Sequence, residues 1–364
     1  MRIAFTILVS FHALLHALGF LKAFGLADLK QLTTTISKPM GVVWLFACIL
    51  FVVYAVFFAF KNNLFWLVGL VAVIFSQIAI NSSWQDTKFG TLINVIVLCV
   101  SLAGFGSWNY FNNYNKEVSA VFQQDTFMPT AVLSENDIQQ LPEQVKKYIR
   151  FVGAVGKPKV SHFKAEFTGE IREDAYSPWM PFTCIQFNFL KEPTRLFFMK
   201  AKMKGFPIGV FHKFRNGKAT MGVRLFSLIH VQRLEGAEMN VSETVTFFND
   251  MCVLAPASLI DNRIKWLGAE RNTVKASFTN KEITVTAVLY FDDRGALVNF
   301  ISQDRYAGNT GKKYAWATPL KNYQQLEGQQ IMENAETIYS YPDGDFIYGK
   351  FTLKSISYNP TGIN

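Results

Sequence analysis

The chain is organised around the stretch Asn240-Val-Ser-Glu-Thr-Val-Thr-Phe-Phe-Asn-Asp-Met-Cys-Val-Leu-Ala-Pro-Ala-Ser-Leu-Ile-Asp-Asn-Arg-Ile-Lys-Trp266. Asn240 followed by Glu243 is typical of a helix N-cap box, and Pro256 suits the first turn of a second, short helix. Apolar residues occur on nearly every side, so we expect both helices to be buried against the neighbouring strands. Asn249 and Asp250 would be carried into that contact, where polar groups need partners. The stretch is therefore a structural centre and a candidate site.

The sequence on both sides of this stretch predicts strands, because apolar residues alternate there with a period of two. Arg215-Asn-Gly-Lys218 is a strong β-hairpin signal, since a type I′ turn needs positive φ at both central residues. Ser134 with Asp137 opens an amphipathic helical stretch in which Pro142 marks the first turn of the main helix. We predict a soluble α+β part over residues 134–364. It would be a curved antiparallel sheet, half-barrel-like and of about ten strands, wrapped on short helices near 138–152 and 241–260.

The composition changes near residue 112. Before that point the chain has six of its 36 Lys and Arg residues and two of its 27 Asp and Glu residues. The net charge of +9 therefore divides into +4 and +5, and no nucleic-acid-binding patch is needed to explain it. No phosphate-binding Gly-rich loop, zinc-ligand spacing, nucleophile elbow or His-Glu-x-x-His motif occurs in the sequence.

Four apolar runs fill residues 1–111, and each is close to the roughly 20 residues that a helix needs to cross a membrane. The runs are residues 3–21, 41–60, 64–80 and 91–111, and none contains Lys, Arg, Asp or Glu. We predict a four-helix transmembrane domain over 1–111 and a polar juxtamembrane linker over 112–133. The protein would be a multi-pass integral protein of the cell (plasma or inner) membrane with the lipid bilayer as its partner.

An even number of crossings places both termini on the same side, but the signals for that side disagree. An inside amino terminus would put three basic residues in the cytoplasm and four outside, which slightly favours the opposite orientation. These residues are Arg2, Lys61 and Lys116 against Lys22, Lys30, Lys38 and Lys88. The short basic start and the lack of a disulfide framework favour the cytoplasmic side, which we expect for the soluble part.

Polar residues in or beside the membrane runs are candidates for function. His12 and His16 lie one helical turn apart and share a face; an ionisable residue in a membrane span is a functional hypothesis, and a neutral hydrogen-bonding role is the alternative. Trp84, Asp86 and Lys88 lie in the loop between the third and fourth runs, where the two charges would pair at the membrane surface or solvate a turn. The other runs contain no His, Asp or Glu, so we expect no metal and no other cofactor.

The 35 Phe residues, many of them on strands, would either line a cavity inside the curved sheet or fill it as solid core. An Arg after an Asp at a strand end can bind a carboxylate or phosphate group, although a structural salt bridge is commoner. The expected ligand contacts are Phe182, Phe187, Phe198, Phe248 and Trp316. The polar candidates for catalysis are Glu243, Asn249, Asp250, Asp304 and Arg305.

Eight motifs carry a resemblance to known sequences. They are Trp179-Met-Pro-Phe182, Leu196-Phe-Phe-Met199, Ala219-Thr-Met221, Glu243-Thr-Val-Thr-Phe-Phe-Asn-Asp-Met-Cys-Val-Leu-Ala-Pro256, Asp304-Arg-Tyr306, Tyr341-Pro-Asp-Gly-Asp-Phe-Ile-Tyr-Gly349, His16-Ala-Leu-Gly-Phe-Leu-Lys-Ala-Phe24 and Trp84-Gln-Asp-Thr-Lys-Phe-Gly-Thr91. In these motifs the chain resembles a family of bacterial proteins known only as a domain of unknown function. The resemblance covers nearly the whole length and implies the two-part architecture, but it implies no activity. On pattern alone, the soluble part is also similar to the curved half-barrels of lipoprotein carriers.

Three functional hypotheses follow. In the first, the protein is a membrane-anchored module that binds a lipid or other apolar ligand in a Phe-rich cavity. In the second, it is a membrane-associated enzyme acting on a lipid-like substrate, which requires the five polar candidates to converge in one cleft. In the third, it is a sensor or assembly module whose sheet edge recruits another protein, which requires an exposed apolar patch and no pocket. No nucleic acid is expected as a partner.

Overall fold

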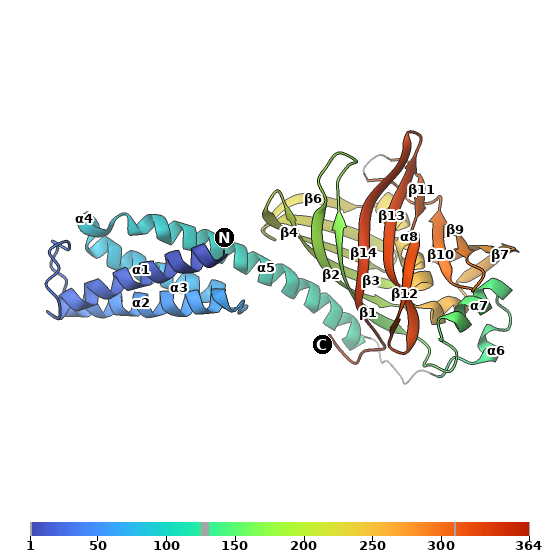
Figure 1. Ribbon diagram of the computed structural model, residues 1–364, viewed down its shortest axis with the longest axis horizontal. Coiled ribbons are helices and arrows are strands. Elements are labelled where there is room, and N and C mark those ends of the chain that lie inside the picture. The colour runs from blue at the N-terminus through green and yellow to red at the C-terminus, as the bar shows by residue number, and fades with distance from the viewer. Residues whose placement is uncertain (1, 125–130, 309–310, 364) are drawn as a thin grey trace. The chain divides into compact units, whose positions relative to one another are not determined.

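The computed structural model describes residues 2–124, 131–308 and 311–363. The chain divides into two compact units, Met1–Tyr110 and Phe111–Asn364. Each unit is labelled by its helices and strands in Figure 1. Helix α5 (Gly90–Gln124) begins in the first unit and ends in the second.

The first unit is built from α1 (Arg2–Ala23), α2 (Lys38–Ala59), α3 (Phe65–Ser82), the one-turn α4 (Trp84–Thr87) and the beginning of α5. Helices α1, α2, α3 and α5 are long and apolar enough to cross a membrane. Their outer faces expose large apolar side chains, among them Ile7, Phe11 and Ile74, which in water would be unfavourable. Inside the unit, Gly19 lies directly against the indole of Trp44, where a Cβ atom would collide with the ring, so α1 and α2 approach closely.

The second unit contains one open antiparallel sheet of fourteen strands in the part of the chain that the structure describes. Its order is β6-β5-β4-β3-β2-β1-β14-β13-β11-β10-β9-β8-β7, and β12 pairs with β13. The strands are β1 (His162–Ile171), β2 (Met180–Phe189), β3 (Thr194–Met203), β4 (Phe206–Arg215), β5 (Lys218–Leu225), β6 (Ile229–Glu235), β7 (Ile264–Glu270), β8 (Thr273–Asn280), β9 (Ile283–Phe291), β10 (Leu297–Ser302), β11 (Ala315–Ala317), β12 (Leu320–Leu326), β13 (Gln329–Tyr341) and β14 (Gly344–Tyr358).

The sheet has more strands than the roughly ten expected from periodicity. The sequence pattern did not resolve β6, β7 and β12. Strands β6 and β7 form the two edges of the sheet and are mostly exposed, so no buried face imposes alternation on them. The β4–β5 hairpin is as predicted: Asn216 and Gly217 both have positive φ, and Arg215 pairs with Lys218.

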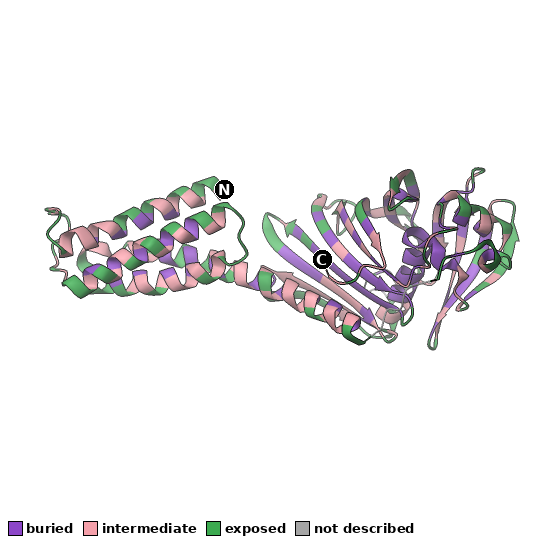
Figure 2. Ribbon diagram, turned by 90° about the horizontal axis from the view of Figure 1, so that it is seen from below, coloured by how far each residue is buried: buried purple, intermediate pink, exposed green. Residues whose placement is uncertain are grey.

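Helix α8 (Ala237–Leu254) lies inside the curve of this sheet and is followed by the 3₁₀ helix η1 (Pro256–Ile260) (Figure 1). It contacts β5 and β6 near one edge, and β9, β10 and β13 in the other half of the sheet. Every residue from 242 to 254 is buried, as the apolar residues on all its sides predict (Figure 2). The helix begins three residues before the expected cap. Asn240 does not cap it, because its Oδ1 accepts a hydrogen bond from the backbone of Ala219 at 2.7 Å and so fixes α8 to β5.

The helical stretch expected near 138–152 is divided into α6 (Glu135–Ile138) and α7 (Glu143–Phe151). Ser134 and Asp137 form the predicted capping box, and Pro142 precedes α7 as its N-cap. The hydroxyl of Tyr148 donates to the carbonyl of Cys252 at 3.0 Å, which connects α7 to α8.

Residues 112–124, expected to be part of a linker, form the end of α5 instead, and residues 125–130 of that expected linker lie outside the described residues. Tyr114, Val118 and Val121 are buried and recur at helical spacing, a stripe that the polar composition conceals. The stripe packs on the sheet: the Tyr114 ring lies 5.6 Å from that of Phe198. Lys213 of β4 pairs with Glu117 at 2.5 Å. One face of β2 and β3 is therefore covered by α5.

Candidate functional site

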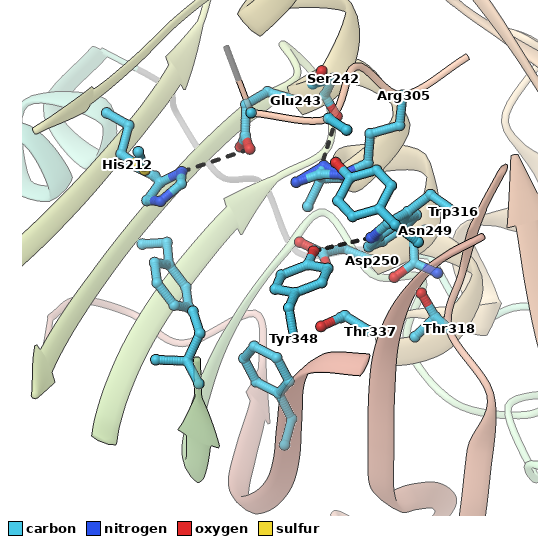
Figure 3. A pocket seen from close by; sticks show the side chains of 18 of the residues that line it. His212, Ser242, Glu243, Asn249, Asp250, Arg305, Trp316, Thr318, Thr337 and Tyr348 are labelled. Carbon is cyan, nitrogen blue, oxygen red and sulfur yellow. Dashed lines mark hydrogen bonds and ion pairs between the residues drawn. The ribbon is translucent and has the colours of Figure 1, made fainter. Parts of the chain in front are cut away.

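The concave side of the sheet and α8 surround a cavity of about 500 Å³, part of whose lining is drawn in Figure 3. The volume lies within the roughly 300–1,000 Å³ of small-molecule sites. Its wall contains Phe167 of β1, Phe197 and Met199 of β3, Met221 of β5 and Phe351 of β14. The curved sheet and α8 therefore leave a pocket that its Phe residues do not fill completely and that opens to solvent beside exposed residues such as Glu173 and Glu238.

Strand β3 shows why the cavity contains some aromatic residues and not others. Arg195, Phe197 and Met199 line the cavity, whereas the intervening Phe198 contacts Tyr114 of α5 on the opposite face. Successive side chains of a strand point to opposite faces, so a shift of one position exchanges cavity wall for outer core. Both faces of β3 are buried, and alternation alone cannot distinguish them.

The five expected ligand contacts are placed differently by the structure. Trp316 lines the cavity. Phe187 packs against Phe122 of α5, as Phe198 does against Tyr114. Phe182 contacts Phe351 with ring centroids 5.1 Å apart, and Phe248 packs on Phe278 and Phe300. The last four therefore belong to the packed core. The sequence indicates that these aromatic residues are buried, but it does not indicate which buried surface they contact.

Arg195 holds two buried carboxylates of α8. Its Nε donates to Asp250 at 2.8 Å, and its Nη1 donates to Glu243 at 3.3 Å. The amides of Gln186 and Asn188 also donate to Asp250, at 3.1 and 2.9 Å. This cluster joins β2, β3 and α8, and it gives each acid a charged partner, which buried carboxylates need.

Burial would raise the pKa of Glu243, but the Arg195 guanidinium and His212 outweigh it and lower this pKa to about 2. Burial raises the pKa of Asp250, although Arg195 and the Asn188 amide oppose that change. His212 Nδ1 lies 3.6 Å from Glu243 Oε1, which is beyond ordinary hydrogen-bond length. Glu243 is thus ionised at neutral pH and engaged by Arg195.

Arg305 has different surroundings. Its Nη1 donates to Thr246 Oγ1 at 3.3 Å, and its guanidinium lies 4.7 Å from the ring centroid of Trp316 and 5.9 Å from that of Tyr339. The indole Nε1 of Trp316 in turn donates to the hydroxyl of Tyr348 at 2.9 Å (Figure 3). Aromatic faces attract and orient the guanidinium without neutralising its charge.

Four of the five polar candidates line the cavity: Glu243, Asn249, Asp250 and Arg305. Asp304 does not. Its carboxylate accepts from the backbone and hydroxyl of Thr286 at 2.8 and 2.9 Å and pairs with Lys313 at 3.3 Å. The two acids of α8 share Arg195, Arg305 bonds to Thr246 and Asp304 lies outside the cavity, so the five side chains do not converge on one point.

Sequence reasoning missed Arg195, Gln186, Asn188 and His212. A usable signal was present in β2 and β3, where Gln186, Asn188 and Arg195 are polar residues within otherwise apolar strands. In the described part of the chain, no group of three or more His, Cys, Asp and Glu residues is placed to hold a metal ion.

The polar residues singled out in the first unit make local contacts. His12 Nε2 lies 3.2 Å from Asn94 Oδ1, and the Ser76 hydroxyl lies 2.8 Å from His16 Nε2 and 2.9 Å from Asn94 Oδ1. This network joins α1, α3 and α5 and corresponds to the hydrogen-bonding alternative; a further role stays a prediction.

The remaining residues singled out there lie around α4. Asp86 accepts from Thr33 and Thr34, at 2.8 Å from the Thr33 hydroxyl and 2.9 Å from the Thr34 backbone. Lys88 lies over the ring of Phe89, and Trp84 is half exposed. Asp86 therefore joins α4 to the loop that follows α1.

The second unit defines a class of protein: an open antiparallel sheet curved around one buried helix, with an internal cavity of mixed aromatic, aliphatic and charged lining. The chain belongs to a family of unknown function (DUF6544), whose sequence profile matches residues 131–351, more than half of the chain. The family resemblance expected from the sequence motifs is confirmed for residues 131–351.

Two solved structures are similar to this chain. One is a LolA superfamily protein from Nitrosomonas europaea, with 8% sequence identity, a TM-score of 0.37, and coverage of 63% of this chain and 95% of the other. The second is a DUF1329 family protein from Desulfovibrio piger ATCC 29098, with 12% identity, a TM-score of 0.35, and coverage of 59% and 92%. Comparison with curated proteins found no match. None of these comparisons assigns a ligand or an activity to the chain.

Proposed function

We propose that the protein is a membrane-anchored module that binds a lipid or other apolar small molecule in the cavity of its second unit. The observation that carries the proposal is the cavity itself, about 500 Å³ in volume, whose wall combines Phe, Met and other apolar side chains with a set of polar and charged ones. Burial of apolar surface contributes roughly 25 cal/mol per Å², so an acyl chain would gain substantially from entering it.

The kind of lining supports a flexible apolar ligand. Met199, Met221, Met239 and Met332 all face the cavity. Methionine is unbranched and polarisable, so such a wall adapts to ligands of irregular shape. The four helices that are long and apolar enough to cross a membrane support the anchoring half of the proposal, because a bilayer is a source of apolar ligands.

The proposal is tested by filling the cavity. Met221→Trp adds a large side chain to its wall, and Thr220→Trp is the matched control because Thr220 is the neighbouring residue on β5 and is not part of the wall. Full-length protein of each kind is purified, and co-purifying lipids are quantified by mass spectrometry. We expect Met221→Trp to lower bound lipid by about tenfold, equivalent to roughly 1.4 kcal/mol, and Thr220→Trp to leave it unchanged. Wild-type protein that carries no lipid and takes up none when it is offered would contradict the proposal.

A second candidate, an enzyme acting on a lipid-like substrate, is favoured by one observation, the proximity of His212 to ionised Glu243 in the cavity wall. An imidazole beside a carboxylate can act as a general base. Incubation of the wild type and of His212→Ala with membrane lipids distinguishes the candidates: conversion that depends on His212 supports an enzyme, and recovery of unchanged lipid from both supports a binding module.

A further inference from the structure

We propose that the ligand of this cavity is an amphiphile whose headgroup carries an anionic oxygen, a carboxylate or phosphate, and that Arg305 binds it. The inference rests on the proposed lipid-binding function and specifies the chemical class of its ligand.

Three arginines line the cavity: Arg172, whose guanidinium donates to two backbone carbonyls, Arg195 and Arg305. Arg195 is neutralised by Glu243 and Asp250. In the described ranges, by contrast, no carboxylate lies within 4.0 Å of Arg305, and its guanidinium makes one hydrogen bond, to Thr246. Two carboxylates are thus engaged by one arginine. Glu243 and Asp250 act on Arg305 only at longer range, so among the described residues the Arg305 guanidinium has no carboxylate in direct contact with it.

Three buried donors at this cavity have no hydrogen-bond partner in the described part of the chain. Arg305 Nε is buried without a hydrogen-bond partner, and so are Asn249 Nδ2 and Thr318 Oγ1, both of which belong to residues that line the same cavity. An unsatisfied buried polar group costs about 1–3 kcal/mol, so its presence calls for an explanation. All three atoms can donate a hydrogen bond, and the oxygens of a carboxylate or phosphate can accept several.

The other acids of the wall are either exposed or already hydrogen-bonded. Glu173, Glu235 and Glu238 also line the cavity but are exposed to solvent, where charges are screened over roughly 8–10 Å. Asp250 is covered by Arg195 and by the amides of Gln186 and Asn188. These acids therefore oppose an anion less than their number suggests.

Aromatic rings orient the guanidinium of Arg305. Trp316 and Tyr339 pack against Arg305, and the indole of Trp316 is itself held by Tyr348. A guanidinium that is already oriented loses little freedom when it binds a carboxylate or phosphate with two parallel hydrogen bonds. The apolar wall, with Phe197 and Phe351, would accommodate the attached chain.

The experiment compares three probes that share an oleoyl or oleyl chain: oleate, oleoyl lysophosphatidate and oleyl alcohol. Binding to delipidated full-length protein is measured for the wild type, Arg305→Gln and the control Arg294→Gln, an exposed residue that pairs with Asp292 outside the cavity. We expect Arg305→Gln to weaken binding of an anionic probe by about tenfold to a hundredfold, the effect of a hydrogen bond to a charged group, and to leave oleyl alcohol unchanged. Arg294→Gln should bind all three as the wild type does.

The three probes and the variants distinguish the possible results. Tighter binding of oleate or of lysophosphatidate by the wild type identifies the headgroup as carboxylate or phosphate. Equal binding of anionic and neutral probes by the wild type, or an equal loss of both in Arg305→Gln, overturns the inference while leaving the binding function standing. If the wild type binds none of the probes, both proposals fail.

A second variant covers the case in which Arg305→Gln does not fold, which its circular dichroism spectrum would reveal. Thr318→Val keeps the shape of the side chain and removes the hydroxyl donor. We expect it to weaken the anionic probe by a few-fold and to leave oleyl alcohol unchanged. Unchanged affinity for the anionic probe would count against the inference.

Discussion

Buried charge in the second unit is concentrated on a few residues whose partners lie far apart in the sequence. Arg195 is separated by 55 residues from Asp250 and by 48 from Glu243, yet it bonds to both. Such a cluster costs desolvation free energy when it forms, but losing one member leaves another charge buried without compensation. The consequences of substitution here are therefore asymmetric and can be measured.

Replacing Arg195 by Met should lower the unfolding free energy of the second unit by about 3–5 kcal/mol, because Glu243 and Asp250 would be left buried without a cation. Hydrogen exchange of the α8 amides in the full-length protein measures the change. The triple variant Arg195→Met, Glu243→Gln, Asp250→Asn should recover part of the loss, since it removes all three charges. A single variant as stable as the wild type would contradict the role assigned to Arg195.

Acid should destabilise the second unit in part through Glu243. Its pKa falls from 4.5 to about 2 in the folded protein, so the ionised form favours folding. This contribution is complete above about pH 4.5 and is lost as the pH falls towards 2. Stability measured against pH in the wild type and in Glu243→Gln isolates it, because Asp250 is present in both. Parallel curves between pH 4.5 and 2 would refute the assignment.

At the scale of elements, the end of α5 is the clearest departure from expectation. Residues 112–124 are polar enough in composition for a linker, but Tyr114, Val118 and Val121 form a buried stripe against β2, β3 and β4. The concave face of β3 can border a cavity because α5 covers its other face. The outer face of β3 is thus packed against α5, while its inner face borders the cavity.

Tyr114→Ala should therefore destabilise the second unit by about 3–5 kcal/mol, the cost of removing a fully buried aromatic side chain. Hydrogen exchange of the β2 and β3 amides is the measurement. Lys116→Ala, an exposed position two residues further along the helix, is the control and should have little effect. If both variants behave as the wild type, the α5 segment is not part of the folded unit.

At the scale of the whole molecule, occupancy of the cavity should be linked to stability. A ligand that binds only the folded state raises its stability by about 2.7 kcal/mol at a hundred times its Kd. Oleate added to delipidated full-length protein in nanodiscs should raise the thermal unfolding midpoint of the second unit. The rise should be absent in Met221→Trp and present in Thr220→Trp. A midpoint that does not respond in the wild type would argue against an internal binding site.

Much of the architecture could be predicted from the sequence. Local patterns of periodicity, turn residues and hydropathy predict four elements of the fold. These are the four apolar helices, the antiparallel sheet, the Asn216-Gly217 hairpin and the buried helix around Asn249. The edge strands β6 and β7 were missed because exposed edges carry no buried alternation. Three of the polar candidates, Glu243, Asn249 and Asp250, line the cavity because polar residues in a helix that is apolar on every side must be carried inward, and Arg305 lines it from the segment after β10.

The position of the cavity relative to each strand could not be read in the same way. Phe197 and Phe198 are equally apolar neighbours, but one faces the cavity and the other faces α5. Periodicity specifies that they point to opposite faces; which face is hollow depends on the curvature of the complete sheet and on what covers its outside. The tertiary structure also decides that Arg195 pairs with two acids and that Arg305 has no such pair among the described residues. These contacts join strands and a helix that lie far apart in the chain. The partners of a side chain are set by the folded path of the backbone and not by spacing along the sequence.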